Sequence, residues 1–228
     1  MRIGIISDLH EPFTHPMYSR FVQDIFEAWD IDKFHFIGDI LDNHALSFWE
    51  HYRDGLSAET EAEKAEKAVQ RWYKLFPKAT VDIGNHDARP DRVASKAGLP
   101  SRYMKDYKEL WNTPGWDWQF SHRFDDVLYE HGTGTSGKDG AINRAIQKRT
   151  SLVMGHCHAF AGIKFHANDT SRIFGMNVGC GVDHSTYAVE YGKNYVTRGV
   201  LGCAVVIDGT PYFEPMPCGP KEKYRKRK

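Results

Sequence analysis

Short continuous apolar runs alternate along the first half of this chain with longer stretches that have a helical period. The apolar runs 2–7, 33–38 and 80–84 have the length of buried strands. Between them, the apolar residues of 17–29 fall on one helical face, and those of 57–76 recur in steps of four and three residues. The order strand, helix, strand, helix, strand predicts an α/β fold in which helices cover a sheet.

The second half of the chain has a different pattern. Residues 89–111 are predicted to be helical or irregular, and one helix is predicted near 139–149. No repeat or Pro/Gly-rich linker divides the chain, so we expect a single domain over 1–220 followed by a tail at 221–228. The remaining apolar segments predict short strands at 116–120, 126–131, 151–156, 161–166, 172–178, 203–208 and 211–216.

The charge of this chain is unevenly distributed between the tail and the rest. The 228 residues have a formal net charge of zero, yet residues 221–228 carry six Lys or Arg against Glu222 alone, a net +5. The rest of the chain is therefore −5 by subtraction. This division fits a solvated tail, and it also fits a tail that contacts nucleic acid.

The distribution of apolar residues and cysteines indicates a cytoplasmic protein. The first apolar run stops at Ser7 and Asp8, so it lacks the pattern of a secretory signal peptide. No apolar run is long enough to span a membrane. The four cysteines show no CxxC spacing, and without an export signal they are expected to be reduced thiols.

Metal-binding residue types follow the predicted strands. The carboxyl ends of strands in open α/β sheets gather at one edge, so segments far apart in sequence are expected to converge there. Glycines beside these residues would allow sharp turns and a close approach of the backbone. The segments are Asp8-Leu9-His10, Gly38-Asp39, Gly84-Asn85-His86-Asp87, Glu130-His131-Gly132 and Gly155-His156-Cys157-His158.

The chemistry of these side chains indicates transition metals. Carboxylate, amide oxygen and imidazole together suit Mn, Fe, Ni or Zn better than Ca, which prefers an all-oxygen shell. Seven donors exceed the needs of one tetrahedral zinc and match two divalent ions that share a carboxylate. We expect two Mn ions first, with Fe, Ni or Zn as alternatives. The seven side chains are Asp8, His10, Asp39, Asn85, His131, His156 and His158.

The five segments, with Asp42 closing the second, resemble the signature motifs of calcineurin-like metallophosphoesterases over residues 1 to about 160. The resemblance implies a four-layer α/β/β/α sandwich with a dinuclear centre. It implies that Asp39 bridges the two metals, that His86 contacts the scissile phosphate and assists the leaving group, and that Asp87 orients the His86 ring. The implied ligands of one metal are Asp8, His10, Asp39 and His158, and those of the other are Asp39, Asn85, His131 and His156.

Two segments depart from the family pattern. The chain has Asn177-Val178-Gly179-Cys180 where the family often has Asn-Pro-Gly-Ser. Asn43-His44 follows Asp42 where Ser/Thr protein phosphatases have Arg-Gly, which argues against that branch. Near the motifs, His44, Arg89 and His184 fit either a substrate contact or a solvated loop.

The resulting prediction is a metal-dependent phosphoric ester hydrolase. The expected substrates are phosphodiesters, nucleic acid among them through the basic tail, or phosphomonoesters, cleaved by in-line attack of metal-bound hydroxide. A protein phosphatase is one alternative. The other is a non-catalytic scaffold of the same fold that binds a partner. The presence of His86 beside a full ligand set argues against the scaffold, which has no need of a leaving-group histidine.

Overall fold

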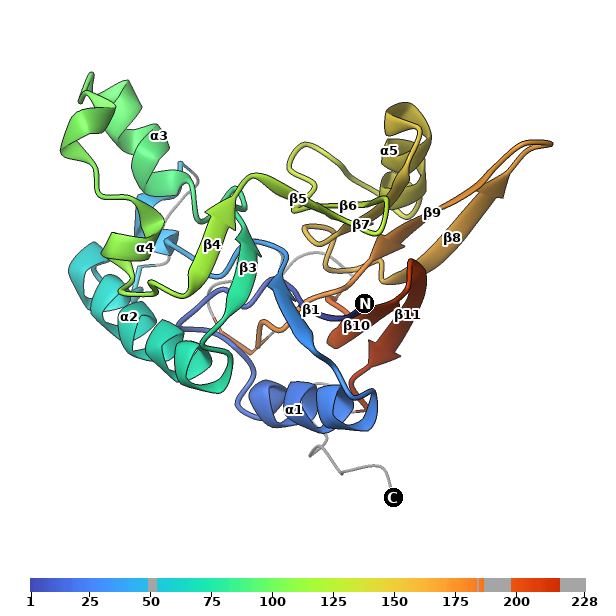
Figure 1. The fold of residues 1–228 in the computed structure, drawn as a ribbon. Helices are drawn as coiled ribbons and strands as arrows, with labels where there is room; N and C mark the ends of the chain where they lie inside the picture. Colours follow the sequence, from blue (N-terminus) through green and yellow to red (C-terminus); the bar gives the residue numbers. More distant parts are fainter. Residues whose placement is uncertain (49–52, 184, 187–197, 218–228) are drawn as a thin grey trace.

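The computed structural model describes residues 1–48, 53–183, 185–186 and 198–217. The basic tail at 221–228 lies outside the described residues, as does His184. The described chain forms two β-sheets with helices on their outer faces (Figure 1). This confirms the predicted α/β class.

The first sheet has six strands in the order β11-β10-β1-β2-β3-β4. Strands β1 to β4 are parallel; beyond β1, β10 is antiparallel to β1 and β11 is antiparallel to β10. The three early apolar runs of the sequence form the neighbouring strands β1, β2 and β3, and the prediction that they are strands is confirmed. The strands are β1 (Arg2–Ile6), β2 (Lys33–Phe36), β3 (Ala79–Asp82), β4 (Trp116–Gln119), β10 (Gly202–Ile207) and β11 (Thr210–Pro215).

The second sheet has five strands in the order β5-β6-β7-β9-β8. Strands β6, β7 and β9 are parallel, and the edge strands β5 and β8 are antiparallel to their neighbours. The sequence analysis missed β5 because the segment SHRF is short and largely polar and lies at an edge. The strands are β5 (Ser121–Phe124), β6 (Val127–Glu130), β7 (Ser151–Met154), β8 (Gly162–Ala167) and β9 (Arg172–Asn177).

The helices α1, α2 and α5 lie within one residue of their predicted ends, and α3 and α4 lie in the segment 89–111 that was predicted to be helical or irregular. None of those in the described part of the chain is long and apolar enough to cross a membrane. The α-helices are α1 (Tyr18–Ala28), α2 (Ala58–Leu75), α3 (Arg89–Lys96), α4 (Tyr107–Leu110) and α5 (Gly140–Lys148), and the 3₁₀ turns are η1 (His44–Leu46) and η2 (Ser101–Tyr103).

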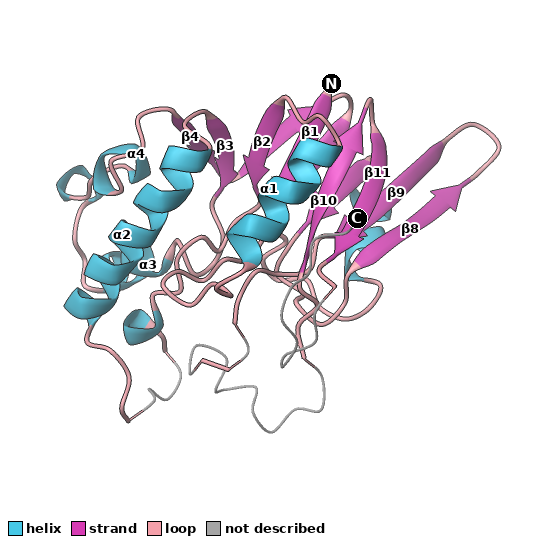
Figure 2. Ribbon diagram, turned by 90° about the horizontal axis from the view of Figure 1, so that it is seen from below, coloured by secondary structure: helices cyan, strands magenta, loops and turns pink. Residues whose placement is uncertain are grey.

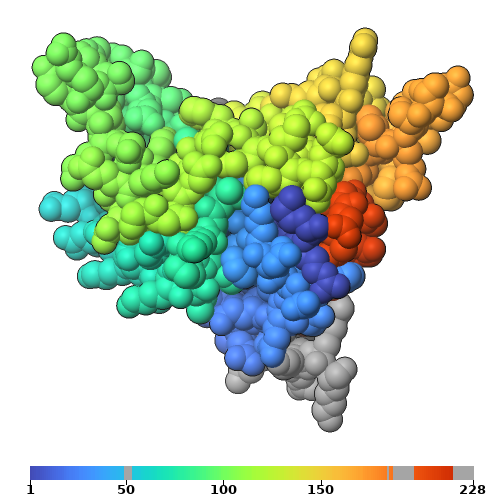
Figure 3. Space-filling model, viewed as in Figure 1, coloured from blue at the N-terminus to red at the C-terminus, as the bar shows by residue number. Residues whose placement is uncertain are grey.

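Figure 2 shows α1 and α2 lying over one face of the first sheet. Three apolar clusters separate four layers of secondary structure. Helices α1 and α2 pack on the first sheet through residues such as Phe26 and Trp72. Ile5 of the first sheet and Val153 of the second belong to the apolar layer between the sheets. Ala145 of α5 covers the other face of the second sheet. The arrangement is therefore helix, sheet, sheet, helix. The α3–α4 segment and the β8–β9 hairpin project on opposite sides (Figure 3).

Helix α2 also fixes a turn next to the candidate site. Its first residues are capped by Ser57, whose side chain accepts a hydrogen bond from the N–H of Thr60. Glu61 is buried, and its carboxylate accepts hydrogen bonds from the N–H groups of His44 (2.6 Å) and Ala45 (3.0 Å). The first turn of α2 thereby holds η1 in place directly after the second motif.

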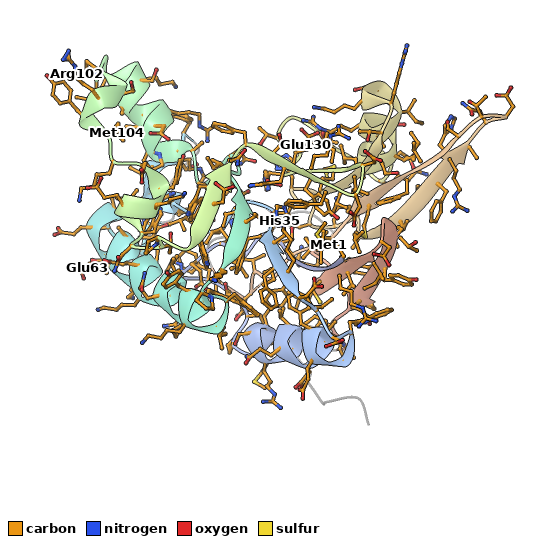
Figure 4. All side chains as sticks on the ribbon, viewed as in Figure 1. Met1, His35, Glu63, Arg102, Met104 and Glu130 are labelled. Atoms are coloured by element: carbon orange, nitrogen blue, oxygen red, sulfur yellow. The ribbon has the colours of Figure 1, made fainter. Side chains whose placement is uncertain are left out.

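A buried polar cluster ties the two sheets together. Asp82 of β3 accepts from both His35 of β2 (Nε2 to Oδ2, 3.1 Å) and His122 of β5 (Nδ1 to Oδ1, 2.7 Å). His35 is fully buried between the sheets (Figure 4), and its Nδ1 lies 2.8 Å from the hydroxyl of Thr80. Burial lowers the pKa of His35 to about 3, so this imidazole stays neutral in the folded chain. Three strands thus share one carboxylate.

Replacing Asp82 with Ala is expected to lower the free energy of unfolding by about 3 kcal/mol, because two buried imidazole N–H groups lose their acceptor. Urea unfolding followed by circular dichroism measures the loss. The matched control is Asp117→Asn, since the exposed Asp117 lies 3.5 Å from His122 Nε2 and should change stability by less than about 0.5 kcal/mol. Equal losses for both variants would show that the cluster does not tie the sheets.

Candidate metal centre

The predicted metal ligands follow strands of both sheets. Asp8, Asp39 and Asn85 come after β1, β2 and β3, and His131 and His156 come after β6 and β7. Because β1, β2 and β3 are parallel, their carboxyl ends lie at one edge of the first sheet. The same holds for β6 and β7 in the second sheet. Each sheet therefore contributes its own group of side chains.

Unusual backbone conformations aim these side chains. Asp8, His10, Asp39 and His156 have φ values of 48°, 50°, 49° and 67°, in the left-handed region that residues other than glycine rarely adopt. The N–H of His10 donates to the carbonyl oxygen of Asp39 (2.9 Å), which holds the first two loops together. Such conformations persist only where the surrounding structure enforces them, and they concentrate at functional sites.

Two glycines permit the close approach of the strand ends. A Cβ atom at Gly84 would collide with the carboxylate and the backbone nitrogen of Asp39. A Cβ atom at Gly155 would collide with the carboxylate of Asp8 and the hydroxyl of Ser7. Any other residue at either position would push a predicted ligand away from its partners.

Asp8, His10 and His158 form the first cluster. His158 Nε2 lies 2.9 Å from Asp8 Oδ1 and 3.2 Å from His10 Nε2, and His10 Nε2 lies 3.8 Å from the same Asp8 oxygen. The three donor atoms are all within 4.8 Å of one another. Asp8 and His10 are buried and His158 is partly exposed, so the cluster opens to one side.

Asp39, His131, His156 and Asn85 form the second cluster. His131 Nε2 lies 3.0 Å from Asp39 Oδ2 and 3.2 Å from Asn85 Oδ1. His156 offers a third donor atom within 4.8 Å of those of Asp39 and His131. Because His156 and His158 belong to different clusters, the segment Gly155–His158 contributes one imidazole to each.

The two oxygens of Asp39 have separate partners. Oδ1 accepts a hydrogen bond from the backbone N–H of His86 (2.8 Å). Oδ2 faces both clusters, at 3.0 Å from His131 Nε2 and 3.9 Å from His10 Nε2. One carboxylate oxygen therefore lies between the two donor groups, which is where a bridging ligand would lie.

The remaining ring nitrogens support a metal-binding arrangement. His10 Nδ1 lies 2.7 Å from Asp42 Oδ1, and His131 Nδ1 lies 3.0 Å from the carbonyl oxygen of Ile37. In metal sites the imidazole nitrogen that does not coordinate is held by a protein oxygen in this way. The residues present therefore fit two divalent ions, by the identity of their donors and by their outer contacts.

Burial and neighbouring charges shift the pKa values of the centre in opposite directions. Burial lowers the pKa values of His10 and His131, but neighbouring carboxylates raise them by more. Those of Asp42 and Asp8 raise the pKa of His10 to about 10, and that of Asp39 raises the pKa of His131 to about 9. Burial alone would raise the pKa of Asp39, yet the imidazoles of His131 and His86 lower it well below its usual value.

The expectation that Asp87 orients the His86 ring is wrong. The two carboxylate oxygens of Asp87 accept from the backbone N–H groups of Leu41 and Gly84, both at 2.9 Å. His86 Nδ1 instead lies 2.9 Å from the carbonyl oxygen and 3.2 Å from the carboxylate Oδ1 of Asp42. Asp87 therefore braces the loops of the second and third motifs, whereas Asp42 holds the ring.

Asp42 is the residue whose role the sequence analysis missed. Its carboxylate contacts His10 as well as His86, and burial, which alone would raise its pKa, is outweighed by these imidazoles, so the pKa is lowered. The available signal was its place at the end of the second motif, three residues after Asp39. A second finding is Arg89, whose Nη2 lies 3.1 Å from His86 Nε2. His44 is buried beside Asp42, and its Nδ1 lies 3.9 Å from Asp42 Oδ2.

Comparison with known families gives the class of the protein. The family model of calcineurin-like phosphoesterases matches residues 1–195, which is most of the chain. The chain belongs to this family. No curated protein gives a significant match to the sequence.

Solved structures with a related fold cover nearly the whole chain at low identity. Vps29 of Entamoeba histolytica complexed with Zn²⁺ is 13% identical, covers 96% of this chain and 94% of its own, and has a TM-score of 0.48. Vps29 of Cryptosporidium parvum is 9% identical over 94% and 95%, with a TM-score of 0.47. Yfce, a phosphoesterase from E. coli, is 18% identical over 91% and 88%, with a TM-score of 0.46. At these values none of the three supports an argument about the activity of this chain.

Replacing Asp39 with Asn is expected to lower metal occupancy at both positions after reconstitution with Mn. The amide lacks the negative charge that would hold two cations on either side of one oxygen. Elemental analysis of the purified protein measures the metal content, and Asp117→Asn is the control because that carboxylate lies outside the centre. Two metals per chain in the Asp39→Asn variant would contradict a bridging role.

Metal binding is expected to release protons. Coordinating imidazoles must be neutral, yet the raised pKa values of His10 (about 10) and His131 (about 9) keep both protonated near neutral pH. Affinity for Mn should therefore rise as pH rises toward 9. Calorimetric titration at neutral pH in buffers with different ionisation enthalpies measures the release. A binding enthalpy that is independent of the buffer would contradict this account.

Proposed function

We propose that this protein is a phosphoesterase that works with two divalent metal ions, Mn in the first place, held by the seven donors around Asp39. The observation that carries the proposal is the position of Asp39 Oδ2 between two clusters of donor atoms. Two ions in these positions would neutralise charge on a phosphate ester and lower the pKa of a water molecule. Family membership supports the reaction class.

The imidazole of His86 is the proposed proton donor to the leaving oxygen. Its Nδ1 is held by Asp42, and its Nε2, on the other side of the ring, lies 3.1 Å from Arg89 Nη2. The backbone N–H of His86 donates to Asp39 Oδ1, which places the imidazole next to the metal centre without making it one of the seven donors. A protonated His86 would give its Nε2 proton to the departing oxygen, as general acids do.

We further propose that the substrates are phosphodiesters, nucleic acid among them. Asn43-His44 stands where Ser/Thr protein phosphatases carry Arg-Gly, so the arginine of that motif is missing. The basic residues at 221–228 would attract a polyanion to a body that is otherwise net negative. Phosphomonoesters remain the second class to be tested.

Replacing His86 with Ala is expected to slow turnover by about 10²–10⁴-fold for esters with poor leaving groups, because the departing oxygen loses its proton donor. Esters of nitrophenol should lose less, since nitrophenolate departs without protonation. Steady-state rates with matched alkyl and nitrophenyl diesters, at full Mn loading, measure the difference.

The matched control is His166→Ala, which removes an exposed imidazole on β8 that belongs to none of the five motifs. Equal losses for good and poor leaving groups in His86→Ala would contradict the acid role. A wild-type protein that binds two metals and hydrolyses no diester or monoester would overturn the proposed function and favour a scaffold.

A further inference from the structure

Three basic side chains follow one face of α3 away from His86. Arg89, Arg92 and Lys96 are spaced by three and four residues, so they lie along one side of the helix. Arg89 Nη2 is 3.1 Å from His86 Nε2, which places the start of the row at the atom assigned to the leaving group. The ion pairs found among the described residues involve other lysines and arginines, so none of the three has a carboxylate partner there.

Beyond Arg89 the row is exposed to solvent at Arg92 and Lys96, although Arg92 Nη2 also donates to the carbonyl oxygen of Asn85 (2.6 Å). Helix α3, which belongs to the projecting segment at one edge of the molecule (Figure 1), contains no buried residue. Asp91 lies on the opposite side of the helix, where its carboxylate accepts a hydrogen bond from the hydroxyl of Tyr107 (2.7 Å). The acidic residue of α3 is thereby turned away, and the row keeps its positive charge.

An exposed aromatic ring lies against the far end of the row. Lys96 Nζ is 3.6 Å from the ring centroid of Phe48, and the guanidinium carbon of Arg92 is 5.9 Å from it. The Phe48 side chain is nevertheless 55% exposed. Two cations that contact an aromatic ring restrict its orientation. A positive track with an aromatic platform is the arrangement that binds single-stranded nucleic acid, in which phosphates meet cations and bases stack.

Arg89 is fixed in its position beside His86. Its Nη1 donates to the carbonyl oxygens of Asp42 (2.7 Å) and Asn43 (3.2 Å). The Asn43 carbonyl belongs to the segment where protein phosphatases carry Arg-Gly, and the Asp42 carbonyl directly precedes that segment. The arginine that begins α3, two residues after the third motif, thus lies against the second motif, and two fixed contacts direct its remaining N–H groups.

We propose that the leaving group of the hydrolysed diester is itself a nucleotide chain that runs along α3. Its phosphates would meet Arg89, Arg92 and Lys96, and a base would stack on Phe48. The bond between phosphorus and the leaving oxygen breaks, water supplies the new oxygen on phosphorus, and the leaving oxygen takes a proton from His86, which recovers one from water. This inference rests on the proposed function, because in-line displacement puts the leaving group on the His86 side.

The test compares a single-stranded thymidine oligonucleotide with bis-nitrophenyl phosphate, using the full chain loaded with Mn. The readout is the ratio of kcat/KM for the two substrates. In Phe48→Leu the ratio should fall about tenfold, because the base loses its stacking partner, whereas Phe48→Trp should keep it. In Lys96→Ala the ratio should fall, and the dependence of oligonucleotide binding on salt should weaken by about one phosphate contact.

The matched control is Lys67→Ala, which removes the same charge from the exposed side of α2 and should leave the ratio and the salt dependence unchanged. Glu63, one turn earlier on α2, projects outward from the molecule (Figure 4). Unchanged ratios in both Phe48→Leu and Lys96→Ala, with bis-nitrophenyl phosphate still hydrolysed, would overturn the inference alone. Failure of the wild-type protein to hydrolyse either substrate would overturn the proposed function instead.

Discussion

Three carboxylates buried at one place set the main constraint on this structure. Asp8, Asp39 and Asp42 are at most 1% exposed. Negative charges in the interior are costly unless cations and hydrogen-bond donors surround them. The chain meets this demand with imidazoles: His158 beside Asp8, His131 beside Asp39, and others beside Asp42. The same demand makes the place receptive to divalent ions, which would compensate the carboxylates more strongly than protonated histidines do.

The centre is completed only when the two sheets pack together. The first sheet contributes all the carboxylates and Asn85, while His131, His156 and His158 come from the second sheet. A change in the separation or register of the sheets would part His158 from Asp8. The apolar layer between the sheets and the Asp82 cluster therefore belong to the functional architecture, although neither contacts the proposed substrate.

The third motif contributes a side chain to each part of the site. Asn85 joins the second donor cluster, His86 would face the leaving oxygen in the proposed reaction, and Asp87 braces the loops by accepting backbone N–H groups. The helix that follows begins with Arg89 and continues the positive charge outward. This arrangement requires glycine at position 84, because a side chain there would collide with Asp39.

The sequence by itself determined the elements and the inventory of donors. Continuous apolar runs and helical periodicity are local properties, so they predicted β1 to β3, α1 and α2 closely, and the motifs predicted which side chains follow each strand. The sequence pattern did not predict the polar edge strand β5, because an edge strand needs little apolar character. The tertiary structure decided the partnerships across sequence distance: Asp42 rather than Asp87 on the His86 ring, and Arg89 against His86 Nε2. Spacing along the chain could not distinguish Asp42 from Asp87, because which carboxylate reaches an imidazole depends on how two loops from different strands pack.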